Sequence, residues 1–429
     1  MNVLVLHKMG NPKFRREAVR SLEYMVPECR YDLNSIVHDA DLPFPDYLKD
    51  INFHLIILGP TFLCNRHDKS NLNRTKQEYD FIRTSNACKI ALPQDDYDCS
   101  GILDKWMVDW NIDFIYTVCP DKWNILYPNA IKKCQIKLGY TGYISKEWIA
   151  NWANPKPHHL RNIDVSYRAR KLSPNFGSLG QLKWEIADNF KIEVSKHADL
   201  NLDISTSDKD LIAGSKWHEF IENSKFCLTT ASGSSLIDPW NHIRNCVNVY
   251  CAKFPEAKFE EIENHCFPNQ DRKLLFTALS PRNIEAALAK TVQIATPGSY
   301  SGLMDEKAHF IPLNENCSNV SEVLEMMNDR ALVLKIQESC KESILSEFRL
   351  RRENIVNEMV LLAESVINKR NLGMSNQEIV DKKFKKYKAE IITISNRVWK
   401  RKQIEHKIKS VAVGLGFRRL KYLLSHNIK

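Results

Sequence analysis

The chain has 429 residues, of which 43% are hydrophobic and 26% are charged, with only 14 Gly and 17 Pro. This composition supplies enough apolar side chain for two folded domains and excludes a disordered, collagen-like or fibrous chain. Twelve cysteines stand singly without a CxxC pair, a pattern typical of reduced thiols in a cytoplasmic protein. The sequence contains no run of 18 uncharged apolar residues, so it predicts no membrane-spanning helix.

The positive charge is concentrated at the C-terminal end. The whole chain carries 61 Lys and Arg against 52 Asp and Glu, a net charge of +9. Residues 382–429 contain 15 Lys and Arg and two acids, a net charge of +13, whereas residues 1–381 carry −4. We therefore expect a mildly acidic body and a basic tail.

The first 120 residues alternate between strand-like and helix-like segments. Strands are predicted at 2–7, 35–38, 53–58, 89–93 and 113–119, and helices at 15–25 and 73–83. Apolar strands separated by helices indicate a parallel sheet covered on both faces. Residues 1–150 are therefore expected to form an open α/β domain whose ligands bind at the carboxyl ends of the strands.

A second α/β series follows the Pro-rich segment 151–161, which is a predicted linker. Its strands are predicted at 163–167, 226–229, 247–250 and 291–295, and its helices at about 180–190 and 281–290. From about 320 to 368 the spacing of apolar residues is helical. The sequence thus predicts two Rossmann-like α/β domains facing a cleft, the second at 151–350, then a C-terminal helix at 351–381 and a basic helical tail at 382–429.

The stretch 280–311 is the most informative for function. Ser280 and Pro281 predict a helix start, and a strand and a Gly-containing turn follow. A helix start at the carboxyl edge of a sheet presents free N–H groups to a phosphate, and Glu285 in that turn suits a diol such as ribose. Any helix start prefers the same residues, however, and spacing alone favours plain capping.

This stretch resembles the donor-binding element of two-domain (GT-B) glycosyltransferases of the bacterial surface-polysaccharide type, which build O-antigen or capsule and are similar to families 1 and 4. Further segments fit that branch in order: DVSYRAR at 164–170, GQLK at 180–183, SGSSLIDP at 232–239, GSYSG at 298–302 and HFIPL at 309–313. Four N-terminal segments fit its acceptor domain: AVRSLEY at 18–24, VHDA at 37–40, ILGPTFL at 57–63 and PQDDYD at 93–98. The resemblance covers roughly residues 1–350.

The resemblance implies a GT-B fold in which residues 1–150 bind the acceptor and residues 151–350 bind a nucleotide-sugar donor. It implies transfer of the sugar from a nucleotide diphosphate to a lipid-linked or growing surface glycan, with no metal or other cofactor. The expected donor-binding residues are Arg168, Arg170, Lys183, Ser232, Gly233, Ser234, Arg282 and Glu285. Guanidinium groups suit phosphate oxygens, and hydroxyl and N–H groups add further donors.

Two departures from the related enzymes are visible. Ala278 stands seven residues before Glu285, where related glycosyltransferases carry a second glutamate. Ala231 precedes the SGSS loop at the place where an acid is frequent. A carboxylate expected near the transferred sugar is therefore missing, which motivates a non-catalytic alternative: a nucleotide-sugar-binding or glycan-binding subunit of an assembly.

Two acidic clusters, at 38–41 and 95–98, follow strands of the first domain. An acceptor hydroxyl must lose a proton as it attacks the sugar, so we expect a general base at Asp39 or Asp96. The alternative role of an Asp in a loop is to form a turn. Both clusters also contain a DxD triplet, the metal-holding element of single-domain (GT-A) glycosyltransferases. That second alternative leaves the second α/β domain unexplained.

The basic tail mixes cations with apolar side chains such as Phe384, Tyr387 and Trp399. This pattern suits an amphipathic helix lying on anionic lipid. A solvated helical extension and a nucleic-acid-binding arm are the alternatives, and no RNP-type or zinc-type motif accompanies the charge. We therefore predict a cytoplasmic protein held peripherally on the inner face of the cell membrane by residues 382–429, with no nucleic-acid partner.

Overall fold

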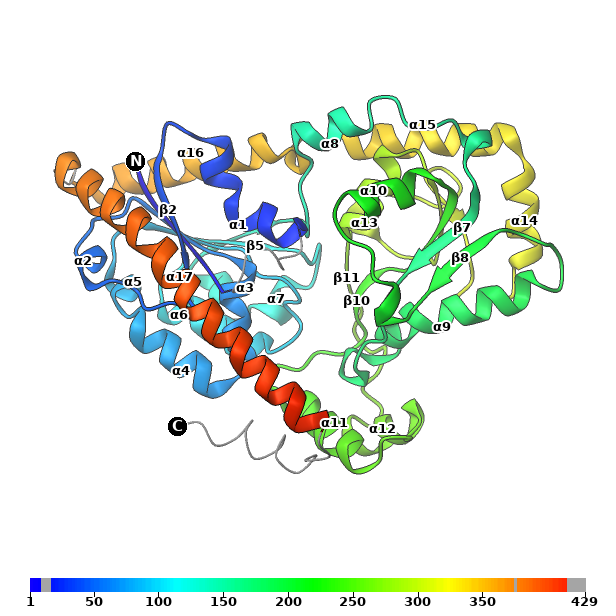
Figure 1. The fold of residues 1–429 in the computed structure, drawn as a ribbon, viewed down its shortest axis with the longest axis horizontal. Helices are drawn as coiled ribbons and strands as arrows, with labels where there is room; N and C mark the ends of the chain where they lie inside the picture. Colours follow the sequence, from blue (N-terminus) through cyan, green and yellow to red (C-terminus); the bar gives the residue numbers. More distant parts are fainter. Residues whose placement is uncertain (9–16, 374–375, 415–429) are drawn as a thin grey trace.

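The computed structural model describes residues 1–8, 17–373 and 376–414, which form two α/β lobes side by side (Figure 1). Each lobe is built around one parallel sheet. The prediction of two Rossmann-like α/β domains followed by C-terminal helices is confirmed.

The first domain contains a six-stranded parallel sheet in the order β2-β1-β3-β4-β5-β6. Its strands are β1 (Asn2–His7), β2 (Asn34–Asp39), β3 (Leu55–Leu58), β4 (Cys88–Ala91), β5 (Phe114–Thr117) and β6 (Gln135–Leu138). Its helices are α1 (Glu17–Cys29), α2 (Asp46–Lys49), α3 (Pro60–Leu63), η2 (Cys64–His67), α4 (Lys69–Glu78), α5 (Phe81–Thr84), α6 (Ser100–Asp109), α7 (Trp123–Leu126), η3 (Ala130–Lys132) and α8 (Lys146–Asn151). Every residue of β1, β3, β4 and β5 is buried, as expected for strands covered by helices on both faces.

The second domain contains a five-stranded parallel sheet in the order β13-β12-β9-β7-β8, and β10 and β11 form a separate antiparallel pair. Its strands are β7 (Ile163–Arg168), β8 (Leu202–Ser205), β9 (Ser224–Thr229), β10 (Ser232–Ser234), β11 (Phe276–Ala278), β12 (Val292–Ala295) and β13 (Ile311–Pro312). Its helices are η4 (His158–Leu160), η5 (Pro174–Phe176), α9 (Gly177–Val194), η6 (Asp208–Asp210), α10 (Ser215–Glu222), α11 (His242–Lys253), α12 (Phe259–Cys266), α13 (Pro281–Leu288), η7 (Tyr300–Gly302), α14 (Val320–Asn328), α15 (Arg330–Ser346) and η8 (Phe348–Leu350).

The strand predicted at 247–250 is wrong, because these residues lie within α11. The Asp238 carboxylate accepts hydrogen bonds from the main-chain N–H groups of His242 at 2.8 Å and Arg244 at 2.9 Å, which satisfies the helix start. Val249 is 72% exposed on that helix. The β-branched composition of the segment is therefore overridden by the capping of the helix and by its position at the surface.

Helix α16 (Arg352–Arg370) returns to the first domain after the second is complete. Its Ile355 and Met359 belong to the same hydrophobic cluster as Val5 of β1 and Leu288 of α13. One core thus includes side chains from both domains.

Helix α17 (Gln377–Gly414) begins before the predicted tail and runs along the first domain, orange to red in Figure 1. Phe384 and Tyr387, which the sequence assigns to a lipid-facing tail, are each 2% exposed and lie in the first domain's core. The spacing of apolar residues is the same in a helix that packs on protein and in one that lies on lipid. The sequence therefore does not distinguish these two positions of the helix. Residues 415–429 of the predicted tail lie outside the described residues. None of the described helices is long and apolar enough to cross a bilayer.

A main-chain junction joins the two domains. The Cys99 N–H donates to the Asp238 carbonyl oxygen at 2.8 Å, and the Asp238 N–H donates to the Tyr97 carbonyl oxygen at 3.0 Å. Gly101 lies against the ring of Trp240, where a Cβ atom would stand 2.8 Å from the indole. The junction holds the acidic loop after β4 next to the Ser/Gly-rich loop after β9.

Candidate functional site

The candidate site lies beside this junction, between the loops that follow β4 and β9. Lys183 of α9 donates to the hydroxyl of Ser232 at 3.2 Å. Burial lowers the pKa of Lys183, Asp95 of the first domain raises it, and Arg282 lowers it again. Charges from both domains therefore act on one partly desolvated ammonium group, which is a suitable environment for an anionic ligand.

Arg282 stands in the first turn of α13, which begins as the sequence predicts. Ser280 caps this helix by accepting the N–H of Asn283. The guanidinium carbon of Arg282 is 5.4 Å from the ring centres of both Tyr167 and Trp217. Its Nε is buried and has no hydrogen-bond partner among the described residues. A buried donor without an acceptor costs free energy, so this position fits a site that receives an anion.

Glu285 lies on the same helix and is 8% exposed. Its Oε2 accepts the indole N–H of Trp217 at 2.7 Å. The carboxylate therefore holds the indole ring that flanks Arg282. Binding of a ribose by Glu285 stays a prediction, and it would use a carboxylate that is already oriented by this hydrogen bond.

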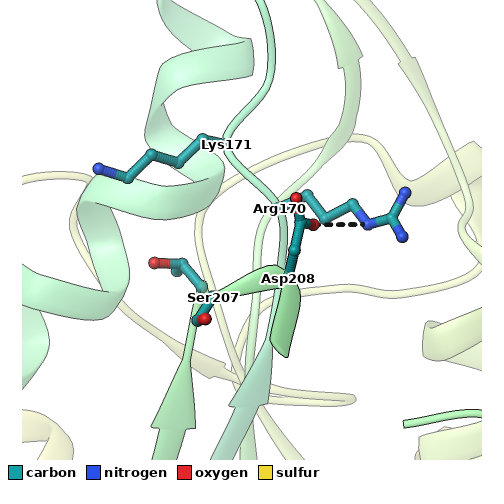
Figure 2. A pocket seen from close by; sticks show the side chains of 5 residues that line it. Arg170, Lys171, Ser207 and Asp208 are labelled. Carbon is teal, nitrogen blue, oxygen red and sulfur yellow. Dashed lines mark ion pairs between the residues drawn. The ribbon is translucent and has the colours of Figure 1, made fainter. Parts of the chain in front are cut away.

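An open hollow of about 600 Å³ lies at the carboxyl ends of β7 and β8 (Figure 2). Its lining residues are Arg170, Lys171, Thr206, Ser207 and Asp208. The Nε of Arg170 is 3.2 Å from an Asp208 carboxylate oxygen, and this carboxylate is 82% exposed. Figure 2 shows Lys171 pointing away from that pair. Because an exposed ion pair contributes little free energy, Arg170 is available to exchange Asp208 for a phosphate.

Three of the predicted donor residues are used by the fold itself. Arg168 pairs with Asp203 at 2.6 Å. The Ser234 hydroxyl lies within hydrogen-bond distance of two main-chain carbonyl oxygens, at 2.9 and 3.0 Å. Gly233 has a φ of 151°, and a Cβ atom there would lie 1.8 Å from a carbonyl oxygen of β11, so only glycine fits. Gly233 and Ser234 thus shape the Ser/Gly-rich loop. Ser232 is the residue of this loop whose hydroxyl accepts a hydrogen bond from Lys183.

The acids of the first domain differ in accessibility. Asp96 is fully buried, accepts the Tyr127 hydroxyl at 2.5 Å, and has its pKa raised by burial. This position gives no support to Asp96 as the base, because an acceptor hydroxyl cannot reach it. Asp39 lies at the carboxyl end of β2, where its side chain accepts a main-chain N–H in a turn. Asp95, the exposed neighbour of Asp96, is the acid of its cluster that acts on Lys183.

Asp98 is the one acid of the two DxD triplets that belongs to a group of three or more possible metal ligands among the described residues. Within the described residues, one group has metal-ligand spacing: His67, Asp98 and Cys99, whose ligand atoms lie within 4.8 Å of one another. Arg244 of α11 forms an ion pair with Asp98 in the same place. Burial, Arg66 and Arg244 lower the pKa of His67. The surrounding positive charge opposes binding of a cation there.

Comparisons with known proteins identify no family. No protein-family model matches the chain, and no curated protein matches its sequence. HepE from Anabaena, solved with UDP, aligns over 85% of this chain and 100% of its own at 8% identity and a TM-score of 0.49. Sucrose-phosphate synthase from Thermosynechococcus elongatus aligns over 86% and 100% at 10% identity and a TM-score of 0.49. A glycosyltransferase from Rickettsia africae aligns over 85% and 98% at 11% identity and a TM-score of 0.46. Similarity this low carries no argument about activity.

Trp217, Thr206 and Ser207 were not predictable as site residues from the sequence. Trp217 and its partner Glu285 are 68 residues apart in the chain, so no local spacing connects them. The polar, half-buried run 202–205 does not predict a strand, although it forms β8. Recognition of β8 would have placed the hydroxyl groups that follow it next to Arg170.

Proposed function

We propose that this chain is a glycosyltransferase that moves a sugar from a nucleotide-diphosphate donor to a hydroxyl group of a glycan acceptor. The observation that carries the proposal is the hydrogen bond from Lys183 to Ser232 in the loop after β9, at a place where Arg282 of the same domain and Asp95 of the first domain both act on the pKa of Lys183. The acceptor is a lipid-linked or growing surface glycan, such as O-antigen, capsule or lipopolysaccharide, at the cytoplasmic face of a bacterial membrane.

The two cations stabilise the leaving group. When the bond between the sugar and the phosphate breaks, the nucleotide diphosphate gains negative charge. Lys183 and Arg282 are both partly withdrawn from water, which strengthens their attraction to that charge. The Arg282 Nε–H and the Ser232 hydroxyl supply directed hydrogen bonds to phosphate oxygens. In this proposal the protein's own cations, and not a metal ion, neutralise the charge of the leaving group.

Asp95 serves as the general base in this proposal. It accepts the Tyr97 hydroxyl at 2.6 Å, which orients its carboxylate, and it has a φ of 52°. As the acceptor oxygen forms its bond to the sugar, Asp95 takes the hydroxyl proton. Asp39 is retained as an acid that positions the acceptor.

A second candidate function is a nucleotide-sugar-binding or glycan-binding subunit without catalysis. The observation that favours it is the pair Ala231 and Ala278, which stand where related enzymes carry acids. Both side chains are buried, at 3% and 7% exposure, and Ala278 pairs in register with Ser232. This end of the site therefore takes no carboxylate from these two positions.

Nucleotide-sugar hydrolysis separates these candidates. Purified protein is incubated with UDP, GDP, dTDP and CMP sugars in EDTA, and free sugar is measured. We expect slow release from one donor, and loss of that release in Arg282→Ala. Arg272→Ala is the matched control, because Arg272 is exposed and pairs with the exposed Glu315. Binding of one donor without release would favour the binding subunit, and release only with added divalent metal would favour the DxD alternative.

A further inference from the structure

Helix α17 has one face on the first domain and one face in solvent. The residues of the inner face recur every three or four positions and are buried or half-buried: Val380, Lys383, Phe384, Tyr387, Glu390, Ile391, Ile394, Ser395, Val398, Trp399 and Lys402. This period is that of one continuous stripe on an α-helix. The contact with the domain therefore extends over more than twenty residues and is not limited to the first turns.

Polar contacts fix the helix along its length. Asn34, the first residue of β2, donates to Asp381 at 2.8 Å. The Tyr387 hydroxyl lies 2.9 Å from Nδ1 of His38, near the other end of β2. Beyond that strand, Lys402 pairs with Asp41 at 3.0 Å. The helix therefore runs from the amino end of β2 to the loop at its carboxyl end.

The outer face is basic. Its exposed cations are Lys382, Lys385, Lys386, Lys388, Arg397, Lys400 and Arg401. Three of them pair with acids one turn away on the same helix, at 2.8 to 3.8 Å. The other four form no ion pair with any residue in the described part of the chain. Exposed aliphatic groups accompany them, since Ile392 is 65% and Ile404 is 58% exposed.

We propose that the outer face of α17 binds an anionic lipid surface while its inner face stays fixed to the first domain. Residues 377–405 carry nine Lys and Arg against four acids, and residues 406–429 carry six against none. Like charges on one helix repel each other, and anionic headgroups relieve that repulsion. Exposed isoleucines among the cations gain from contact with lipid and gain little from a nucleic-acid backbone. This combination favours lipid over nucleic acid.

Because α17 is fixed to the first domain, one defined side of the protein faces the membrane. What this means for the enzyme rests on the proposed function. From Lys402, which pairs beside the carboxyl end of β2, α17 continues to Gly414. These twelve residues span about 18 Å at the rise of an α-helix. The lipid surface is thereby held beside the carboxyl edge of the first sheet, where Asp39 lies at the end of β2. A lipid-linked acceptor reaches the site while the protein stays bound.

The test is co-sedimentation of the full chain with vesicles of one part phosphatidylglycerol to three parts phosphatidylcholine. The variant replaces Lys382, Lys385, Lys388, Arg397 and Lys400 together by Gln. At about 1 kcal/mol for each cation near the surface, with only some of them in contact at once, we expect its partition coefficient to fall by about 30-fold or more. The matched control replaces five exposed cations of the second domain by Gln, with the same change in net charge: Lys196, Lys209, Lys216, Lys253 and Lys335. The control is expected to bind within about twofold of the unchanged protein.

An equal fall in both variants, or no fall in either, would overturn the proposal. So would binding to a 20-base-pair DNA duplex without binding to vesicles at the same salt concentration, which would make nucleic acid the partner. Hydrogen exchange tests whether the helix stays in place. We expect the amides of 380–402 and of β2 to keep their protection on vesicles, and loss of protection in β2 would show that the helix detaches.

Hydrolysis of the donor in solution keeps the two proposals separate. The outer-face variant is expected to release sugar at the rate of the unchanged protein, because none of its five positions lies in the donor site. Vesicle binding without turnover of any nucleotide sugar would leave this inference standing and refute the proposed function. Turnover of a nucleotide sugar without vesicle binding would support the proposed function and refute this inference.

Discussion

The charged side chains at the carboxyl edges of the two sheets differ in their accessibility to ligands. In the second domain, Arg282 has a buried Nε without a partner among the described residues, and Arg170 pairs with an exposed carboxylate. In the first domain, Asp96 is sealed in the core, and Asp98 pairs with Arg244 from the other domain. At the first edge, residues 238–240 pack against the loop after β4, whereas the second edge keeps an open hollow. A charged residue at a strand end is therefore available for ligands only where no other segment packs against it.

Asp95 is exposed at the first edge, and its replacement is expected to have the largest effect. Asp95→Asn removes the proposed general base, so turnover should fall by about 10²–10⁴-fold while nucleotide affinity changes little. Steady-state transfer and calorimetric binding measure the two quantities. Asp96→Asn is the control, since this buried side chain is expected to affect stability and not turnover per folded molecule. Full turnover in Asp95→Asn would place the base elsewhere.

Arg282→Ala tests the open edge. The substitution removes the proposed charge-assisted bonds to phosphate, so we expect affinity for the nucleotide diphosphate to weaken by about 2–4 kcal/mol. Arg282→Lys should recover only part of this loss, because an ammonium group lacks the two-point geometry of guanidinium. Calorimetric titration in EDTA measures both. Affinity unchanged in the Ala variant, with the fold intact by circular dichroism, would remove Arg282 from the site.

His38 tests how tightly the first edge is closed by α17. Burial lowers its pKa to about 4 from the ordinary 6.5, and Tyr387 of α17 lies against it. Between pH 6.5 and about 4, His38 binds a proton in the unfolded chain and not in the folded chain. The free energy of unfolding therefore decreases as the pH falls from 6.5 to about 4. The full loss is about 3 kcal/mol for this group. Denaturant unfolding across this range should show a shallower decline in His38→Leu, and an unchanged slope would show that His38 is not protected from water.

Glu285→Gln is expected to have the smallest effect. Gln keeps an oxygen that accepts the Trp217 indole N–H, so the ring beside Arg282 should stay in place. Loss of the negative charge should weaken a ribose contact by about 1–2 kcal/mol. The measurement is the affinity for a nucleotide diphosphate and for its 2′,3′-dideoxy analogue. If Glu285 binds the ribose, the substitution weakens the first and leaves the second unchanged, whereas equal changes would assign Glu285 to the support of Trp217 alone.

The strands of both sheets were predictable wherever burial on two faces makes a continuous apolar run, as in β1 and β3. The half-exposed strands β6 and β8 lack that signal, because an edge strand mixes polar and apolar residues. The helix start at Ser280 was predictable because capping depends on local chemistry. The sequence pattern of 247–250 failed because a helix cap outside the segment decides its conformation.

The residue types of the candidate site were predictable from the sequence. Which of these side chains are free to bind a ligand was not. Lys183 and Ser232 are joined by a hydrogen bond, whereas Arg168 and Ser234, chosen on the same grounds, are held in bonds that shape the fold. Within one run of acids, Asp95 is exposed and Asp96 is buried, although the two are chemically identical. The direction of each side chain depends on a loop whose partners come from the other domain, and no local pattern contains that information.

The most direct test of the central claim is a crystal structure of the chain with a nucleotide diphosphate bound in the presence of EDTA. We expect the β-phosphate to lie within hydrogen-bond distance of Arg282 and of Lys183 or Ser232, with Asp95 facing the same space from the first domain. A nucleotide bound elsewhere would contradict it. A phosphate held through a metal at the Asp-containing loops, seen only when EDTA is omitted, would contradict it equally.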